Sequence, residues 1–341
     1  MVGTFKIVTL AASINENIVN IFEDTYYDTG STKVSGATIH CHKHSGHGYQ
    51  TYLQVVENSC NPGFVSLGLK LGKEKLFNYI NELGFGKKTG IDLNGEATGI
   101  LFKLDKVKDL ELATTAFGQG ISVTAIQQVS AVSAIINNGN LYKPFIVKQV
   151  GDNLINPVLK KENIISPQTS ELVKYALENV VANGSGRNAY IENYRIGGKT
   201  GTAQKVGENG KYMTNNYILS FIGFLSSSNP EYVVYIALDN PKGVTQYGGI
   251  VSAPIAKRVM EDIISIYDVK PDINTLPKQY KWDDTVYITI PQLIGKTKKE
   301  VKSLLKELKI EFIGDGDKVI STTPSENTRV KIGSTIKILL N

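Results

Sequence analysis

A long hairpin between residues 197 and 224 is the feature that most constrains the fold of this chain. Its first segment, residues 197–204, consists of small and polar residues around Lys199, whereas its second segment, residues 217–224, is apolar and rich in strand-forming residues. The segment between them is polar and contains glycine, as a hairpin connection requires. A strand flanked by glycines can pair with the backbone of an extended peptide, with a lysine placed for a carboxylate. The hairpin therefore predicts an antiparallel sheet with a peptide-binding strand.

The tripeptide Lys-Thr-Gly, which this hairpin contains at residues 199–201, also occurs at residues 88–90. The earlier copy follows a helical pattern that ends at Leu83, which is typical of a turn after a helix C-terminus. Only the later copy begins a long hairpin. We therefore expect the copy at 88–90 to be structural and the copy at 199–201 to bind a ligand.

Length and charge limit the class of protein. A chain of 341 residues can hold one large domain and one small one. The net charge of +5 is spread along the chain, and no basic cluster is interleaved with aromatic residues, which argues against nucleic-acid binding. No apolar run has the roughly 18–20 residues that a membrane helix needs.

The N-terminal residues predict a buried helix over residues 4–21, because apolar residues recur there at helical spacing. A signal peptide is a weaker interpretation, since Lys6 lies directly against a brief apolar core and no clear mature start follows. A core helix at the start of a domain is unusual. We therefore expect the chain to begin inside a domain whose earlier part is missing.

The remaining pattern predicts a large domain over residues 1–268 and a small domain over residues 288–341. Helical and strand patterns are interspersed up to a last helix at residues 252–268. Residues 269–287 contain prolines and no periodicity, which is typical of a linker. The small domain predicts a strand, an amphipathic helix at residues 298–308 and three further strands, a compact βαβββ unit.

All four histidines and both cysteines lie between residues 40 and 60. They are His40, Cys41, His42, His44, His47 and Cys60. Such clustering of rare residues predicts a metal site, because thiolate and imidazole groups are zinc ligands. The spacing fits no zinc-finger pattern, and three other interpretations stay open: a disulfide between the two cysteines, two free thiols, or a solvated histidine-rich loop.

Three motifs resemble the signatures of the penicillin-recognising serine enzymes, which are Ser-x-x-Lys, Ser-x-Asn and Lys-Thr-Gly. Residues 59–61 read Ser-Cys-Asn and match the second, residues 199–201 match the third, and Lys6 would end the first. The segments 5–12 and 116–120 also resemble class B penicillin-binding proteins. The second and third signatures occur in the order and at the distance that this family shows.

The last residues of the chain, 288–341, resemble a PASTA domain. Together with the motifs, this makes the chain similar to class B penicillin-binding proteins of a sporulation type that carry one PASTA domain. The resemblance implies an α+β fold of the serine β-lactamase and transpeptidase kind, with an antiparallel sheet flanked by helices and its N-terminal part missing. A small βαβββ PASTA domain would follow.

The resemblance implies a D,D-transpeptidase that cross-links peptidoglycan, in this case in the spore cortex. A serine of such an enzyme attacks the D-Ala–D-Ala amide of a stem peptide, and the acyl group then passes to an amine of a neighbouring stem. Lys6 would activate that serine, Ser59 would relay a proton to the leaving nitrogen, and Asn61 would hold a substrate amide.

The same resemblance assigns substrate binding to the second Lys-Thr-Gly copy. Lys199 would supply positive potential, and the hydroxyls of Thr200 and Thr202, on either side of Gly201, would bind the terminal carboxylate. The implied partners are peptidoglycan stem peptides, β-lactams and other cell-wall synthesis proteins. Full-length members of the family are anchored at the extracytoplasmic face of the bacterial membrane, so we expect an anchor outside this sequence.

The position of the nucleophile departs from the family pattern. The serine should lie three residues before Lys6, and Gly3 occupies that position. Glycine has no side chain to acylate, so we expect this chain not to form an acyl-enzyme. The alternative function is therefore a non-catalytic fragment that binds peptidoglycan or β-lactams.

Cys60 is the middle residue of the Ser-Cys-Asn motif, which connects the cysteine and histidine cluster with the predicted active site. A zinc ion held by Cys41, His47 and Cys60 would fix the loop that carries the motif. Four protein ligands would make this a closed structural site. A zinc-dependent hydrolase is disfavoured, because no glutamate lies beside the histidines to act as a base.

The fourth zinc ligand is predicted from a hairpin over residues 26–42, with its turn at Ser35 and Gly36. Pairing outward from this turn brings Asp28 close to residues 41–43. We therefore expect Asp28 to complete the set, with His44 and His42 as alternatives.

Overall fold

A computed structural model describes residues 3–207, 212–226, 228–279, 287–306, 308–331 and 333–341. The chain forms two compact units, Met1–Gln279 and Tyr280–Asn341, and each is described by itself. Residues 269–279, expected in the linker, hydrogen-bond with the first unit through Asp272 and Leu276. The remainder of the expected linker, residues 280–286, lies outside the described residues. Among the described residues, no helix has the length and apolarity that crossing a membrane takes.

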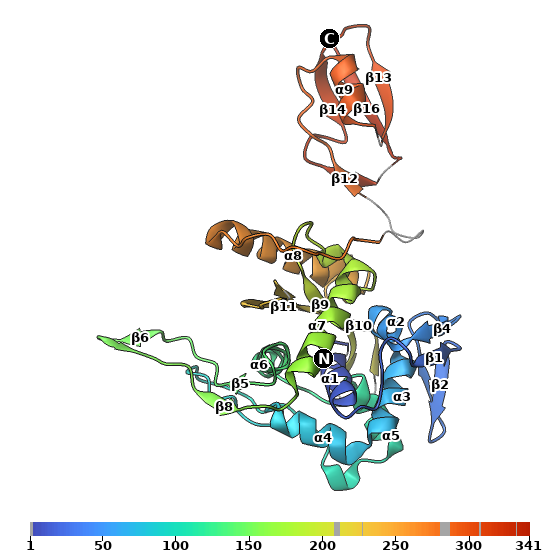
Figure 1. Ribbon diagram of the computed structural model, residues 1–341. Coiled ribbons are helices and arrows are strands. Elements are labelled where there is room, and N and C mark those ends of the chain that lie inside the picture. Colours follow the sequence, from blue (N-terminus) through green and yellow to red (C-terminus); the bar gives the residue numbers. More distant parts are fainter. Residues whose placement is uncertain (1–2, 208–211, 227, 280–286, 307, 332) are drawn as a thin grey trace. The chain divides into compact units, whose positions relative to one another are not determined.

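The predicted hairpin is confirmed as the centre of an antiparallel sheet in the first unit (Figure 1). It consists of β9 (Gly197–Val206) and β10 (Tyr212–Leu225), and β11 (Tyr232–Asp239) pairs with the other side of β10. The order β11-β10-β9 leaves β9, which carries the second Lys-Thr-Gly copy, at an edge. The strands extend beyond the predicted segments, with a shift in register between Tyr212 and Tyr217.

Helices cover both faces of this sheet. The helices of the unit are α1 (Lys6–Asn15), α2 (Tyr52–Glu57), α3 (Asn61–Leu71), α4 (Lys73–Glu82), α5 (Asp109–Ala116), α6 (Ala125–Ile136), α7 (Pro167–Ala182) and α8 (Gly248–Tyr267). Because successive strand residues point to opposite faces, Ile222 and Phe224 join the core around α1, whereas Phe221 and Leu225 pack with α8. This arrangement is the predicted α+β fold.

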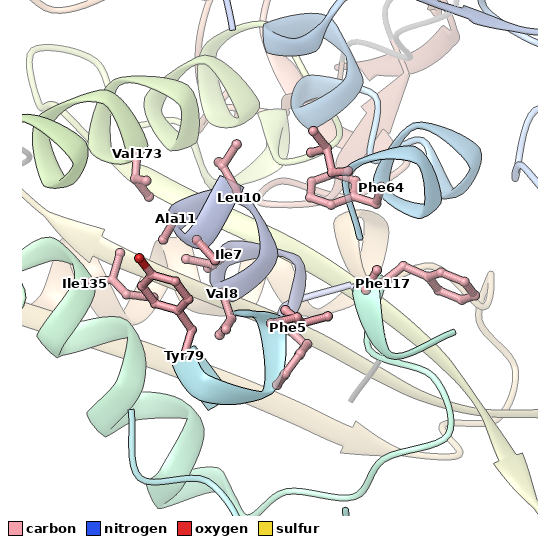
Figure 2. Packing of buried hydrophobic residues seen from close by; sticks show 14 of the residues in the cluster. Phe5, Ile7, Val8, Leu10, Ala11, Phe64, Tyr79, Phe117, Ile135 and Val173 are labelled. Atoms are coloured by element: carbon pink, nitrogen blue, oxygen red, sulfur yellow. The ribbon is translucent and has the colours of Figure 1, made fainter. Parts of the chain in front are cut away.

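Helix α1 lies in the middle of the core, and its residues from Lys6 to Ile14 are all buried. Phe5, Val8 and Leu10 are packed among residues of α3, α4, α6 and α7 (Figure 2). The predicted helix over residues 4–21 is wrong at its C-terminal end. Asn17 has a φ of 54°, and Ile18 N donates to Ser13 O, so the helix closes with a left-handed turn.

The predicted hairpin over residues 26–42 is correct only in part. β2 (Ser31–Val34) pairs with β3 (Ala37–His40) around the predicted turn. Asp28, however, ends β1 (Thr25–Asp28), which pairs with β4 (Gly48–Thr51) instead. The chain changes direction at Gly30, whose φ of 95° suits glycine and where a Cβ atom would lie 2.0 Å from His44 O.

Short strands between residues 141 and 161 form a narrow ribbon that extends away from the helices of the unit (Figure 1). Its strands are β5 (Leu141–Tyr142), β6 (Gln149–Val150), β7 (Asn153–Leu154) and β8 (Leu159–Lys161). β5 pairs with β8, and β6 pairs with β7. The ribbon does not contribute to the central sheet.

The second unit has its own core of aliphatic residues. Its elements are β12 (Tyr287–Thr289), α9 (Lys298–Leu304), β13 (Lys309–Ile313), β14 (Val319–Thr323), β15 (Arg329–Lys331) and β16 (Thr335–Leu340). β16 lies between β13, to which it is parallel, and β14. Its alternate residues Ile336, Ile338 and Leu340 are buried in that core. The predicted βαβββ order is extended by β15, which pairs with β12.

Candidate active site

Lys6 lies at the first turn of α1 with its side chain buried at the junction with α3. Its Nζ donates to Ser59 O at 2.8 Å, to Asn61 Oδ1 at 2.7 Å and to Ser59 Oγ at 3.1 Å. The Lys6 ammonium also lies 5.2 Å from the ring centroid of Phe64. The structure thus brings together the three residues predicted to be catalytic.

The Ser-Cys-Asn motif forms the sharp connection between α2 and α3. A Thr51–Gln54 capping box fixes the start of α2, and α3 begins at Asn61. Ser59 lies between them with a φ of 54°, in the left-handed region that non-glycine residues rarely adopt. Asn61 Nδ2 donates to His40 O at 3.1 Å, which ties the motif to β3.

Lys199 is fully buried on β9, and its Nζ donates to Ser59 Oγ at 2.7 Å. The hydroxyl of Ser59 therefore accepts from both Lys6 and Lys199. These residues are distant in the sequence, and the pairing of β9 with β10 together with the packing of α1 under the sheet brings them to one point.

Burial lowers the pKa values of both lysines. The pKa of Lys6 falls from 10.5 to about 8, because the core removes water from its ammonium, and the charges of Cys60 and Cys41 offset part of this effect. The pKa of Lys199 falls well below its ordinary value through desolvation and then through the charge of Lys6. A lysine whose amine is partly neutral near neutral pH can act as a general base.

Thr200 and Thr202 alternate with Lys199 along β9, so their side chains lie on the opposite face of this edge strand. Thr200 Oγ1 lies 3.0 Å from Ser185 Oγ, and Thr202 Oγ1 accepts from Gly248 N at 3.2 Å. The sequence did not single out Ser185 or Gly248. The glycines around these positions, in Gly-Ser-Gly at 184–186 and Gly-Gly at 248–249, are the signal that indicates a close backbone approach.

Gly201 is the small residue between the two threonines, and it lies opposite Ser220 of β10. Helix α8 begins at Gly248 rather than at the predicted residue 252. The reason is steric: a Cβ atom at Gly248 would lie 2.4 Å from both Gly201 O and Ser220 O. Only glycine allows the helix to begin against the strand.

Gly3 lies against the same strand, just before α1. Its N–H donates to Phe117 O at 3.2 Å, and its φ is 92°. A Cβ atom at this position would lie 2.5 Å from Thr200 O and 2.6 Å from Gly201 Cα. The backbone around Gly3 therefore has no room for a side chain.

A second cluster contains Cys60, the middle residue of the Ser-Cys-Asn motif. Asp28, Cys41, His47 and Cys60 each direct a ligand atom to one point, and these atoms lie within 4.8 Å of one another. Three of these residues are buried and His47 is half-buried. His47 Nδ1 lies 2.7 Å from Asp28 Oδ2 and 3.5 Å from Cys41 Sγ.

Hydrogen bonds within this cluster change how readily its thiols and its imidazole ionise. Both cysteines are free thiols in the structure. A hydrogen bond with Cys60 lowers the pKa of Cys41, and the same hydrogen bond, together with burial, raises the pKa of Cys60. The pKa of His47 is raised, chiefly by its hydrogen bond with Cys41. A cation at this point would allow both thiols to ionise.

The remaining histidines lie outside this set. The rings of His40 and His44 stack on each other with centroids 5.5 Å apart, and both residues are exposed. The ring of His42 lies beside His47, and His42 Nδ1 is 3.9 Å from Cys41 Sγ. Despite its unexpected pairing with β4, Asp28 reaches the cluster, because its strand ends there.

The first Lys-Thr-Gly copy has a different environment. Thr89 donates to Glu96 through its backbone N–H at 2.5 Å and its hydroxyl at 2.6 Å, and Gly90 N donates to the other carboxylate oxygen. Lys88 is exposed. The carboxylate that this turn binds is thus one of the chain's own side chains.

Comparison with known proteins gives consistent matches. The model of the penicillin-binding protein transpeptidase domain matches residues 3–261, and the PASTA domain model matches residues 288–341. The chain is 53% identical to stage V sporulation protein D of Bacillus subtilis over 99% of its own length and 53% of that protein. It is 32% identical to the peptidoglycan D,D-transpeptidase FtsI of Escherichia coli over 66% of this chain and 37% of that protein.

Solved structures agree with these matches. The transpeptidase domain of penicillin-binding protein 3 from Burkholderia pseudomallei is 29% identical, with a TM-score of 0.71 over 79% of this chain and 80% of that one. Penicillin-binding protein 3 from Mycobacterium tuberculosis, solved with aztreonam, is 28% identical, with a TM-score of 0.71 over 81% of this chain and 64% of that one. The chain spans about half the length, or less, of the curated relatives cited above.

Proposed function

This chain belongs to the penicillin-binding protein transpeptidase family, and from that premise we propose that its first unit recognises the D-Ala–D-Ala end of peptidoglycan stem peptides. The observation that carries the proposal is the position of Ser59 Oγ, which accepts from two buried lysine amines at 3.1 and 2.7 Å beside an edge strand. An extended stem peptide would pair with β9. β-Lactams, which the family recognises, would occupy the same place.

The geometry supports a division of roles for acyl transfer. Lys6, with its lowered pKa, would take the proton of the serine that the family has at the position of Gly3. Ser59 would pass a proton to the leaving nitrogen, since its hydroxyl lies between Lys6 and Lys199. The attacked carbonyl carbon would then gain an ester bond to the serine oxygen as the amide bond to D-Ala breaks. An amine of a second stem would take the acyl group from that ester.

Substrate binding would depend on the second Lys-Thr-Gly copy. Lys199 would supply positive potential at the strand edge, because a bound carboxylate favours the ammonium form that burial disfavours, and the Thr200 and Thr202 hydroxyls would bind that carboxylate. Asn61 Oδ1 accepts from Lys6 and one proton of its Nδ2 goes to His40 O, so the second Nδ2 proton would hold a peptide carbonyl of the stem. The Thr202 N–H would be one donor to the oxyanion, a contribution worth about 3–4 kcal/mol in other acyl-transfer enzymes.

Gly3 limits the reaction that this chain can perform, because glycine offers no hydroxyl to acylate. It stands where the family has its serine, and a side chain at this place would collide with β9. We therefore expect binding of peptides and β-lactams without acylation. The similarity to stage V sporulation protein D extends the proposal to peptidoglycan synthesis in the spore cortex, at the extracytoplasmic face of the membrane.

Two measurements test this function. Incubation with a fluorescent penicillin followed by denaturing electrophoresis should give no covalent band, and NMR titration with an N-acyl-D-Ala-D-Ala peptide should show reversible binding. Lys199→Ala should abolish this binding, whereas Lys88→Ala, the matched change in the other Lys-Thr-Gly copy, should leave it intact. A covalent band, or equal binding by both variants, would contradict the proposal.

A structural zinc ion is the second part of the proposal. A tetrahedron with metal–ligand bonds of about 2.0–2.3 Å places its ligand atoms about 3.3–3.8 Å apart. The Cys41–His47 separation of 3.5 Å falls within this range, whereas the His47–Asp28 separation of 2.7 Å is a hydrogen-bond distance that would lengthen when a metal takes the place of the shared proton. Two cysteines, one histidine and one carboxylate are a donor set that zinc accepts. Four protein ligands would leave no place for an activated water.

The role of this zinc would be to fix the Ser-Cys-Asn motif. Cys60 lies between Ser59 and Asn61, and Ser59 has a left-handed backbone whose conformation costs energy. Binding through Cys60 would hold both neighbours toward Lys6, while Asp28 and Cys41 would connect the motif to β1 and to the loop after β3. Metal binding would then stabilise the fold as well as the site.

Metal analysis tests the zinc. Purified protein should contain one zinc per chain, both thiols should resist titration until a chelator is added, and chelation should lower the melting temperature. Cys60→Ser should lose the metal, whereas His44→Ala, which changes an exposed histidine outside the cluster, should retain it. A metal-free protein with two reactive thiols, or with a disulfide between Cys41 and Cys60, would refute this part.

A further inference from the structure

We infer that Ser185 is a positioning residue that directs the Thr200 hydroxyl toward the terminal carboxylate of the substrate. This inference rests on the proposed function, because it assumes that the second Lys-Thr-Gly copy binds a carboxylate. Ser185 Oγ and Thr200 Oγ1 lie 3.0 Å apart, within hydrogen-bonding distance. Neither the three family signatures nor the sequence pattern points to Ser185.

The backbone of Ser185 is held by the end of α2, close to the Ser-Cys-Asn motif. Ser185 N donates to Glu57 O at 2.8 Å. The preceding glycine permits this contact, since a Cβ atom at Gly184 would lie 2.5 Å from the same Glu57 oxygen. Ser185 therefore touches both the segment that leads to Ser59 and the strand that carries Thr200.

The loop around Ser185 is also fixed on its other sides. Gly184 N and Gly186 N both donate to Val180 O, and Arg187 Nη1 donates to Gly184 O at 2.8 Å. On the α8 side, a Cβ atom at Gly249 would lie 2.4 Å from Ser185 O. The position of the Ser185 hydroxyl is thus determined by close backbone packing.

The number of protons on the two threonine hydroxyls explains why this contact matters. A hydroxyl carries a single proton, so it can donate to a carboxylate only if that proton is not used elsewhere. Thr202 Oγ1 accepts from Gly248 N, which leaves its own proton for the ligand. When Ser185 donates to Thr200 Oγ1, the proton of Thr200 becomes free in the same way.

By donating to Thr200 Oγ1, Ser185 thus leaves the Thr200 proton for the ligand, as the Gly248 N–H does for the proton of Thr202. Two hydroxyls on one face of β9 then present donors to the two oxygens of one carboxylate. Hydrogen bonds to a charged group are stronger than neutral ones and depend on direction. A peptide with an uncharged terminal amide would gain much less binding free energy from the two hydroxyl donors than a peptide with a terminal carboxylate.

The test compares binding of an N-acyl-D-Ala-D-Ala peptide with binding of its C-terminal amide, measured by NMR titration of the full chain. Wild-type protein should prefer the carboxylate. Ser185→Ala should weaken carboxylate binding about tenfold, the size expected for one hydrogen bond to a charged group, and leave amide binding unchanged. Ser185→Thr, which keeps the hydroxyl, should restore the preference.

A double-mutant cycle separates positioning from direct contact. In a Thr200→Ala background, Ser185→Ala should have no further effect, because Ser185 acts through the Thr200 hydroxyl. Ser166→Ala, which removes the N-terminal cap at the other end of α7, controls for loss of stability and should keep the wild-type preference.

Three results would overturn the inference while leaving the proposed function in place: an unchanged preference in Ser185→Ala, an equal loss for both peptides, or additive losses in the cycle. A wild-type protein that binds both peptides equally would instead refute carboxylate recognition, and with it the role of Ser185.

Discussion

The Lys6 amine should titrate near pH 8 in the folded protein and near pH 10.5 in the unfolded chain. Its side chain is buried, and desolvation is the largest cause of the lowered pKa. At pH 7 a pKa of about 8 leaves about one amine in ten neutral, against about one in three thousand for an ordinary lysine. This difference is what would allow Lys6 to act as a base.

The same shift predicts how stability depends on pH. Between pH 8 and pH 10.5 the unfolded chain keeps a proton that the folded amine has lost, so the free energy of unfolding rises with pH in this window. A difference of about 2.5 between the two pKa values corresponds to about 3 kcal/mol. This contribution is complete above pH 10.5 and is lost as the pH falls through 8.

The assay is an NMR titration of protein labelled with ¹³C at the lysine ε carbons. Lys6→Met identifies the signal, and the same titration in concentrated urea gives the unfolded reference. Urea unfolding of both proteins at several pH values then measures the Lys6 contribution as a difference. The negative charges of Cys60 and Cys41 raise the pKa of Lys6. A cation bound between these sulfur atoms would neutralise that charge, so the titration midpoint of Lys6 should then lie at or below pH 8.

A midpoint at pH 10 or above in the folded protein would refute this reasoning. It would mean that water or the hydrogen bonds to Ser59 and Asn61 compensate the ammonium for its burial. A stability difference between the wild-type protein and the Lys6→Met variant that does not change with pH would lead to the same conclusion. The role of Lys6 as a base would then lose its physical support.

Two further predictions concern stability. Ile338→Ala should destabilise the second unit by about 2–5 kcal/mol, because Ile338 is fully buried in the core of that unit. Calorimetry should show that the unfolding transition of the first unit is unchanged. A shift of both transitions together would mean that the two units do not unfold independently. Thr124→Ala should cost about 1 kcal/mol in the first unit, because it removes the capping box of α6; a change below a few tenths in urea unfolding would contradict this.

Local patterns determined much of the fold. The apolar run of β10 and the polar, glycine-containing connection predicted the central hairpin, and the helical spacing of apolar residues predicted α1. These features depend on residues close in sequence, and the alternation of apolar residues directly reflects burial. The second unit was predicted for the same reason, except for the short strand β15 and for the end of α9, which closes at Leu304 rather than at residue 308.

Errors arose where contacts between distant residues decide the structure. Asp28 pairs with Gly48 rather than continuing the hairpin of Ser31, because Gly30 packs against the backbone of residue 44. Helix α8 begins at Gly248 because a glycine can approach β9. In both places a glycine is visible in the sequence, but the backbone that it meets is not.

The chemical groups of the candidate site can be read directly from the sequence: the lysines, the Ser-Cys-Asn motif, the threonines, the cysteine and histidine cluster, and Gly3 three residues before Lys6. How these groups are arranged depends on the fold. Two lysines share the hydroxyl of Ser59 because helix α1 packs beneath the sheet, and Ser185 reaches Thr200 because glycines let three backbone segments meet. The pKa of a lysine and the direction of a hydroxyl depend on everything packed around them, and no local pattern in a sequence encodes that environment.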